Sequence, residues 1–223
     1  LHEYDRNAVA DNLRLERQRA CLPFLKKRDP IVPLALWYPN TSLSIKWGGH
    51  LEQAVLLRDL VDYDWLDETL LAAGALERHK LLVIASGNVM ETADATRIAD
   101  WVTRGGRLLV VGVPAFVSVE QTDVPEKTLF GNTSAGRSLG KGMVKRLSSM
   151  TELATELGQL LPALNLPLYD CRADGLYGTQ TGPREFLYLN YTDGPLEARV
   201  SLGDKIVTAE VEPRAIKELT LPE

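Results

Sequence analysis

The stretch 79–113 constrains the fold more than any other part of the sequence. Two uninterrupted apolar runs, at 81–85 and 108–113, enclose a segment in which apolar residues recur at i, i+3, i+4 and i+7. Runs without alternation are typical of parallel strands that helices cover on both faces, and the recurrence between them is typical of an amphipathic helix. The stretch therefore predicts a βαβ unit of a parallel sheet.

The helix expected inside this unit has end signals. Thr92 stands at the position of an N-cap residue, Arg104 lies in the last turn, and Gly105 follows it. A threonine side chain can accept a hydrogen bond from a free N–H of the first turn, and glycine at C′ adopts the left-handed backbone that often ends a helix. We therefore expect a helix from Thr92 to Arg104, and we expect Gly105→Val to destabilise the fold.

Flanking segments extend the sheet in both directions. They predict a first core strand that contains Trp37, a helix, a short edge strand and, later, a fifth strand and another helix, at 34–38, 51–61, 63–65, 143–147 and 151–161. A polar loop is expected at 40–49, and the run 114–141 has no clear periodicity. Loops as long as this run are uncommon inside a compact domain and are usually functional, partner-binding or disordered.

The pattern changes after about residue 166. Apolar and polar residues alternate at 196–202 and 207–211, with a turn at Gly203 and Asp204 between them. Alternation with period two is typical of an antiparallel meander with one face in water. The expected fold class is therefore α/β, a doubly wound parallel sheet with a small C-terminal antiparallel β domain. The expected division is a linker helix from a preceding domain at 1–29, an α/β domain at 30–165 and a C-terminal β domain at 166–223.

Composition limits the partners that this chain can have. The net charge is −5 and no basic patch or tail occurs, which argues against nucleic acid and against an anionic membrane. No apolar run approaches the roughly 18 residues of a membrane span. Cys21 and Cys171 are far apart and outside metal-type spacing. We expect two reduced thiols in a reducing compartment, the cytoplasm, and a single disulfide is the alternative. Because the sequence opens on Leu1, we expect a piece of a longer protein, in which a signal peptide would not be visible.

Ser86, Gly87 and Asn88 follow the first strand of the βαβ unit, where open α/β sheets bind ligands. The flanking residues of a nucleophile elbow would be glycines, but Ile84 and Asn88 stand there. No cysteine occurs at 84–90, and the one His-x-Glu pair near the core, which begins at His50, precedes this turn. We therefore expect neither serine-hydrolase nor glutaminase chemistry, and no catalytic residue is assigned.

Cofactor and metal motifs are also missing from the sequence. The glycine-rich run 136–142 has three residues between its glycines where a phosphate-binding loop needs four, and a strand is expected to follow it instead of a helix. No G-x-G-x-x-G follows a strand, and the three histidines are isolated in the sequence. We expect no cofactor and no metal site.

Two kinds of contact remain to be assigned. Trp47 and His50, with Ser86 and Asn88 at the strand end, are the candidate ligand-binding residues, and a carbohydrate is the candidate ligand; the alternative for Trp47 is a loop or partner contact. Phe116 and Phe130 belong to apolar material without a periodic home. Exposed patches of that kind usually mark interfaces, so both phenylalanines are candidate interface residues of a homo-oligomer.

Several segments together resemble one known family. The runs 81–85 and 105–109, with Trp101 and Val102 between them, resemble the "fV-x-x-GG-x-L" signature of the amidotransferase-like fold that lacks glutaminase residues. This fold occurs as the trimerisation domain of bacterial β-galactosidases of glycoside hydrolase family 42. Residues 140–144 resemble the entry to a late strand of that domain, and 186–192 resemble a strand of the small C-terminal β domain in those enzymes.

The resemblance implies a flavodoxin-like, class I glutamine amidotransferase-like sheet and a non-catalytic region of a carbohydrate-active enzyme. Catalysis would then lie on a barrel domain outside this sequence, and the parent enzyme would be a homo-oligomer, a trimer among the alternatives. The tracts 40–49 and 114–141 do not align with the family and are expected near subunit or domain contacts. The competing hypothesis is a free-standing sugar-binding or sugar-modifying enzyme of the same fold. The intact reading frame would separate the two hypotheses.

Overall fold

The computed structural model describes residues 3–24, 29–45, 50–169 and 175–223. The chain forms two compact units. One unit is Val32–Leu166, and the other combines Leu1–Ile31 with Pro167–Glu223. The α/β domain was expected at 30–165, and the first unit differs from that range by two residues at one end and one at the other.

The first unit contains a six-stranded sheet in the order β2-β1-β3-β4-β6-β5, parallel throughout except for β5 at one edge. Its strands are β1 (Leu34–Trp37), β2 (Asp64–Leu66), β3 (Leu81–Ile84), β4 (Arg107–Val111), β5 (Gly136–Leu139) and β6 (Gly142–Leu147). The predicted parallel sheet is confirmed. The edge hairpin β5–β6 occupies the glycine-rich run, which therefore leads into a strand, as expected, and not into a helix.

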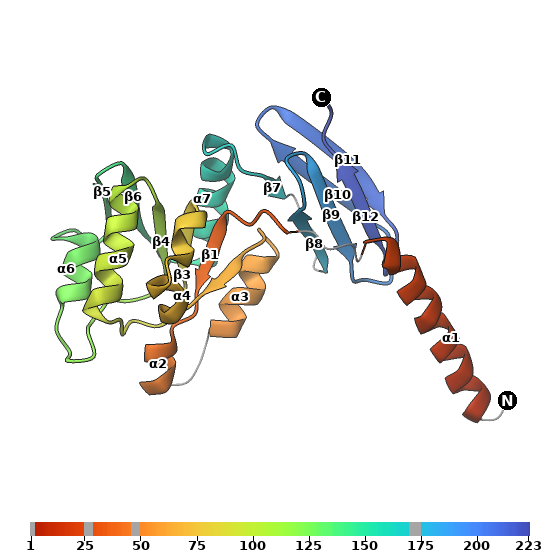
Figure 1. Cartoon of the computed structure of the whole chain (residues 1–223), viewed down its shortest axis with the longest axis horizontal. Coiled ribbons are helices and arrows are strands. Elements are labelled where there is room, and N and C mark those ends of the chain that lie inside the picture. The colour runs from red at the N-terminus through yellow and green to blue at the C-terminus, as the bar shows by residue number, and fades with distance from the viewer. Residues whose placement is uncertain (1–2, 25–28, 46–49, 170–174) are drawn as a thin grey trace. The chain divides into compact units, whose positions relative to one another are not determined.

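Helices cover both faces of this sheet (Figure 1). They are α2 (Asn40–Ile45), α3 (His50–Arg58), α4 (Glu68–Ala72), η2 (Ala75–Arg78), α5 (Thr92–Thr103), α6 (Val124–Phe130) and α7 (Met150–Ala163). The core on the α5 side takes alternate strand residues, among them Leu82 and Ile84 of β3, together with Ile98 and Trp101 of α5. On the other face α7 packs against β4 and β6 and contacts α3. Trp37 is buried, as the core assignment predicted.

The C-terminal end of α5 agrees with the sequence prediction, and the N-terminal end does not. The N-cap is Glu91 and not Thr92, because the Met90 N–H donates to Val117 O at 3.0 Å and Glu91 O already accepts from Asp94 N. At the other end Gly105 has a φ of +127°. Gly105 N donates to Val102 O at 2.8 Å and Gly106 N donates to Trp101 O at 3.2 Å, the bonds of a Schellman motif.

Two segments expected to be loops contain regular structure. The tract 40–49 begins with α2, which follows directly on Pro39, while residues 46–49 lie outside the described residues. The run 114–141 contains α6 and β5. Both elements are short, so neither contributes enough turns or alternations for periodicity to reveal it.

The second unit holds two three-stranded antiparallel sheets and a helix. The sheets are ordered β11-β10-β7 and β12-β9-β8. Their strands are β7 (Leu168–Tyr169), β8 (Leu176–Gln180), β9 (Glu185–Asn190), β10 (Leu196–Leu202), β11 (Lys205–Val211) and β12 (Ile216–Thr220), and the helical segments are α1 (Glu3–Cys21) and η1 (Leu22–Phe24).

The expected single meander is wrong in one respect, since β9 pairs with β8 and β12 and not with β10. The chain turns sharply after β9, because the Asn190 carboxamide donates to Gly194 O at 2.8 Å and to Val211 O at 2.9 Å. The predicted hairpin through Gly203 is confirmed by the β10–β11 register. In the described part of the chain, no helix is long and apolar enough to cross a membrane.

Candidate functional site

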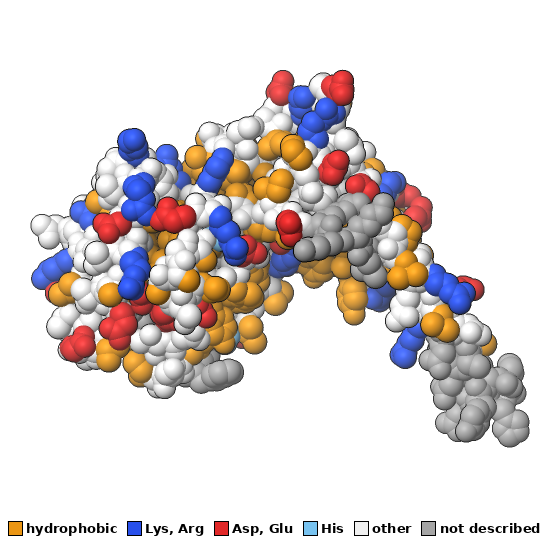
Figure 2. All heavy atoms as spheres, viewed as in Figure 1, with side chains coloured by type: hydrophobic (Ala, Val, Ile, Leu, Met, Phe, Trp, Pro, Cys, Tyr) orange, Lys and Arg blue, Asp and Glu red, His pale blue; other side chains and the backbone are white. Residues whose placement is uncertain are grey.

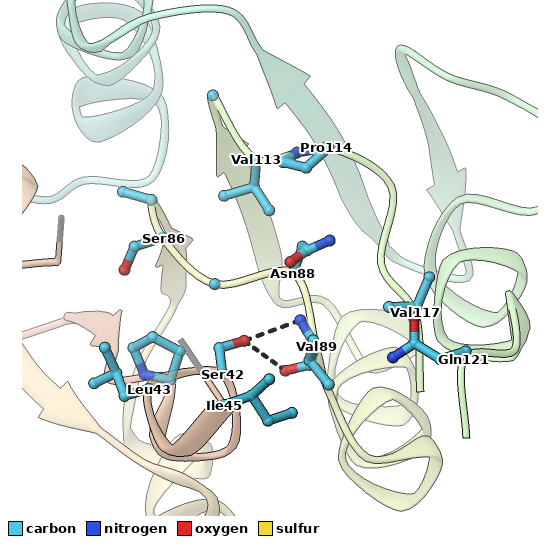
Figure 3. Close-up of a pocket in the computed structure, with 14 residues that line it drawn as sticks. Ser42, Leu43, Ile45, Ser86, Asn88, Val89, Val113, Pro114, Val117 and Gln121 are labelled. Atoms are coloured by element: carbon cyan, nitrogen blue, oxygen red, sulfur yellow. Dashed lines mark hydrogen bonds between the residues drawn. The ribbon is translucent and has the colours of Figure 1, made fainter. Parts of the chain in front are cut away.

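A cavity of about 540 Å³ opens at the carboxyl ends of the central parallel strands (Figure 3). The strand order reverses here, because β1 has β2 as its neighbour on one side, and the chain then crosses to β3 on the other side of β1. Ligands of open α/β sheets bind at such a point. The lining residues are Pro39, Ser42, Leu43, Ile45, Ala85, Ser86, Gly87, Asn88, Val89, Gly112, Val113, Pro114, Val117 and Gln121.

Ser42 fixes the wall that α2 contributes to the cavity. Its hydroxyl accepts a hydrogen bond from Val89 N at 2.9 Å and donates one to Val89 O at 3.0 Å. Gly87 lies in the same turn with a φ of +76°, and a Cβ there would stand 2.5 Å from Pro39 Cβ. Glycine is required at this position by the backbone conformation and by the close approach of the two segments. The turn after β3 is therefore held firmly against α2.

The wall opposite α2 comes from the segment that follows β4. Val89 and Val117 form a parallel bridge, and Val117 N donates to Asn88 O at 2.9 Å. The segment then turns at Gln121, whose φ of +62° is uncommon for a residue other than glycine. Three chain segments that are distant in the sequence thus meet around the cavity.

The described lining of this cavity is polar but uncharged. None of the fourteen lining residues has an ionisable side chain. A serine becomes a nucleophile only beside a general base, and the described lining residues offer no such base to Ser86. The side chains that line the cavity are hydroxyls, carboxamides and apolar groups.

The structure brings together two of the four candidate ligand residues. Ser86 and Asn88 both line the cavity. His50 does not line it; its ring is buried at the start of α3 and meets the Tyr38 ring edge-on at 5.1 Å. Trp47 lies outside the described residues. Sequence reasoning missed Ser42 and Gln121, because the first sits in a short helix and the second in an unpatterned segment.

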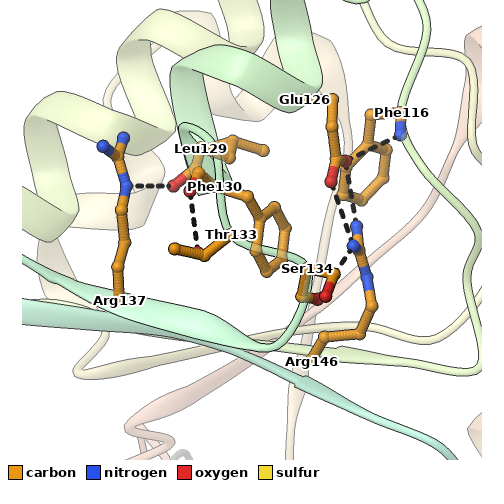
Figure 4. Close-up of polar contacts among 8 residues, drawn as sticks. All are labelled: Phe116, Glu126, Leu129, Phe130, Thr133, Ser134, Arg137 and Arg146. Atoms are coloured by element: carbon orange, nitrogen blue, oxygen red, sulfur yellow. Dashed lines mark hydrogen bonds and ion pairs between the residues drawn. The ribbon is translucent and has the colours of Figure 1, made fainter.

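The expectation that Phe116 and Phe130 form an exposed patch is wrong. Phe116 is 1% exposed and Phe130 is fully buried, and both belong to the core on the α5 side of the sheet. A polar cluster holds them there (Figure 4). Arg146 on β6 binds both carboxylate oxygens of Glu126 at 2.9–3.0 Å, and its guanidinium lies 4.0 Å from the centre of the Phe130 ring.

Glu126 also fixes the segment before α6. Its Oε2 accepts a hydrogen bond from Phe116 N at 2.9 Å. Arg137 closes the other end of α6, because its guanidinium donates to Leu129 O at 2.9 Å and to Thr128 O at 2.6 Å. These contacts give the run 114–141 a defined structure through polar pairs that are far apart in the sequence.

A second cavity of about 470 Å³ lies beside the first and shares Gly112, Val113 and Pro114 with it. Its charged groups are Arg146 and Glu152. Arg146 is paired with Glu126, and the Glu152 carboxylate accepts from Ser148 N at 2.7 Å. Both charges therefore serve the fold.

Two buried groups of the α/β unit that lie outside both cavities, His79 and Asp94, have shifted pKa values. Burial lowers the pKa of His79 below 6.5, although the Asp64 carboxylate acts in the opposite direction. Burial raises the pKa of Asp94, although Arg97 pairs with it at 2.7 Å. The described residues contain no cluster of three or more histidine, cysteine or acidic side chains that could hold a metal ion.

Comparison with solved structures defines the class of fold. The chain aligns with large glycoside hydrolases over most of its own length, at sequence identities of 10–13%. No protein-family model matches the sequence, and no curated protein matches it. The chain therefore has the fold of a region of these enzymes, built from a parallel α/β sheet and small antiparallel sheets.

Three of these structures show how much is shared. The β-galactosidase from Bacillus circulans sp. alkalophilus has a TM-score of 0.61 at 10% identity, over 93% of this chain and 44% of that one. A catalytic mutant of the GH42 β-galactosidase from G. stearothermophilus has a TM-score of 0.58 at 13% identity, over 88% and 41%. The GH42 exo-carrageenase from Bacteroides ovatus has a TM-score of 0.57 at 12% identity, over 86% and 29%. This chain thus spans less than half of the length of each.

Proposed function

We propose that this chain is a non-catalytic structural and assembly region of a GH42-like glycoside hydrolase, in which another domain carries out catalysis. One observation carries the proposal: the fold aligns over 85–93% of this chain with glycoside hydrolases of which it covers 29–44%. The uncharged cavity at the strand ends supports it, since hydrolysis of a glycoside requires two carboxyl groups.

The finer fold assignment belongs to the same proposal. We assign the α/β unit to the flavodoxin-like, class I glutamine amidotransferase-like class, as a trimerisation-type domain. The order β2-β1-β3-β4-β6 supports this assignment, because it matches the doubly wound order with a switch point between the first and third strands. The second unit would be the C-terminal β domain of the same enzyme.

An apolar surface on α2 and α3 supports the assembly role. The residues Ile45, Leu51 and Val55 are 59–61% exposed, and Leu56 is 47% exposed. Helix α3 buries His50, Ala54 and Leu57 on its inner side, so its apolar outer residues form a second stripe. Figure 2 shows hydrophobic side chains gathered over this part of the α/β unit.

The occupant that we assign to this α2–α3 surface is a second copy of the chain. Apolar patches on a soluble protein commonly mark protein interfaces, and closed symmetric homo-oligomers are the commonest assemblies. This surface replaces Phe116 and Phe130 as the candidate interface. It includes Ile45 of the tract 40–49, which was expected near subunit contacts.

Hydrolysis of a nitrophenyl β-galactoside tests the catalytic half of the proposal. We expect the full-length natural protein to hydrolyse it and the pure 223-residue chain to show no turnover. If turnover occurs, Glu68 and Asp94 are the acids to replace, because they are a pair of carboxyl groups that interact with each other. Glu68 accepts a hydrogen bond from Thr41 N on α2 at 2.9 Å, and its charge raises the pKa of Asp94. Turnover by the chain that Glu68→Gln or Asp94→Asn abolishes would contradict the proposal.

A further inference from the structure

Two half-buried polar side chains in the cavity at the strand ends have no hydrogen-bond partner among the described residues. They are the Ser86 hydroxyl and the Asn88 carboxamide, both half-buried on the turn after β3. Figure 3 shows these side chains on the turn, between α2 and the segment that follows β4. Partly buried polar groups normally bond to protein or to water, so these two groups are available to a ligand.

The described lining of the cavity favours neutral ligands. Its fourteen described residues contain no Lys, Arg or His to pair with an anion and no Asp or Glu to pair with a cation. Charged ligands are costly to desolvate without a partner of opposite charge. A neutral hydroxyl group can both donate a hydrogen bond to, and accept one from, a serine hydroxyl or a carboxamide.

Most of the remaining lining residues are apolar. Leu43, Val113 and Val117 line it together with Pro114. A polyhydroxylated ring has both surfaces that this lining requires, because its edge carries hydroxyl groups and its faces carry C–H groups. The cavity volume of about 540 Å³ is within the roughly 300–1,000 Å³ that is typical of small-molecule sites.

The site is also preorganised. The two hydrogen bonds between Ser42 and Val89 join α2 to the turn that carries Ser86 and Asn88. The bond from Val117 N to Asn88 O fixes the backbone of the same turn on its other side. A ligand therefore loses little affinity to ordering of the walls.

We propose that this cavity binds a neutral monosaccharide of hexose size, with the Asn88 carboxamide donating to one ring hydroxyl and accepting from its neighbour, and the Ser86 hydroxyl bonding to a third. We infer non-catalytic binding, because the described lining residues supply no base or acid. The inference rests on the cavity alone and does not depend on the assembly role.

Hydrogen–deuterium exchange of the full-length natural protein tests the proposal, since it locates binding in the chain. The probes are D-galactose, D-glucose and, as the anion arm, inorganic phosphate. We expect at least one hexose to slow exchange in peptides that cover 85–90 and 112–121. Asn88→Leu keeps the branched shape of the side chain and removes both hydrogen-bonding functions, so protection should require about tenfold more sugar or disappear. Ser86→Ala should weaken it less.

Asn132→Leu is the matched control, because Asn132 is an exposed asparagine of the same unit that does not line the cavity. In the Asn132→Leu variant, the hexose should protect the peptides that cover 85–90 and 112–121 as strongly as it does in the wild type. Protection by phosphate and by neither hexose would overturn the proposal, as would protection that Asn88→Leu leaves unchanged. Absence of protection by both hexoses at high millimolar concentration would also overturn it. None of these outcomes bears on the oligomeric state, so the two proposals fail separately.

Discussion

Gly106 offers a sharp test of how α5 packs on the sheet. A Cβ atom at Gly106 would lie 2.4–2.5 Å from three ring atoms of Trp101. Carbon atoms normally approach to about 3.5–4.0 Å, so the indole would have to move by roughly 1 Å. Trp101 is only 4% exposed and belongs to the core. Overpacking of this kind costs about 1–3 kcal/mol, and we expect Gly106→Ala to lower the free energy of unfolding by that amount.

A double-mutant cycle isolates the steric cause. In a Trp101→Ala background the three contacting ring atoms are gone, so Gly106→Ala should cost close to nothing, and the coupling free energy should be at least about 1 kcal/mol. Gly105→Ala is the control. A Cβ there meets no atom closer than 4.0 Å, and its φ of +127° is the obstacle. Its cost of about 1–2 kcal/mol should be the same in both backgrounds.

Urea unfolding followed by tryptophan fluorescence measures these differences. All four tryptophans lie at positions 37–101, inside the α/β unit, so the signal reports on that unit and three tryptophans remain after Trp101→Ala. Equal costs of Gly106→Ala in the two backgrounds would refute the packing argument. An unchanged midpoint for Gly105→Ala would refute the Schellman motif.

Two further predictions concern buried side chains of the same unit. His79 donates from Nδ1 to Val32 O at 3.0 Å, and burial lowers its pKa below 6.5. Between the folded-state pKa and pH 6.5 the unfolded chain therefore binds more protons than the folded chain. The free energy of unfolding should fall as the pH falls through this range. His79→Asn should remove that slope in urea titrations at pH 5–8, and an identical slope would contradict the assignment. Phe116→Ala should lower the free energy of unfolding by about 3–5 kcal/mol and leave the subunit number unchanged, whereas a changed mass with an unchanged urea midpoint would restore Phe116 as an interface residue.

The parallel sheet could be predicted because its strands carry continuous apolar runs. Every residue of β3 is buried, and a strand with that property is apolar at successive positions whatever its neighbours are. Gly105 was predictable for a similar reason, since a helix end requires a particular backbone conformation and few residues supply it. Local chemistry alone determines both features.

Features that depend on distant pairs could not be predicted. The Phe116 segment is held beside β6, because Phe116 N donates to Glu126 and Glu126 pairs with Arg146 of β6. No local sequence pattern indicates contacts between positions so far apart. The same applies to the cavity. Ser86 and Asn88 were found through their place at a strand end, whereas Ser42 enters only because its hydroxyl bonds to Val89.

The subunit mass of the full-length natural protein tests the assembly role most directly. Native mass spectrometry or light scattering at micromolar concentration should give a closed homo-oligomer. Leu51→Lys with Val55→Lys places two charges on the exposed stripe of α3 and should reduce the mass to that of a smaller species. Leu70→Lys, at a leucine of α4 that is 40% exposed, should leave the mass unchanged. A monomeric wild type, or an oligomer that the α3 variant leaves intact, would contradict the proposal that this surface assembles the enzyme.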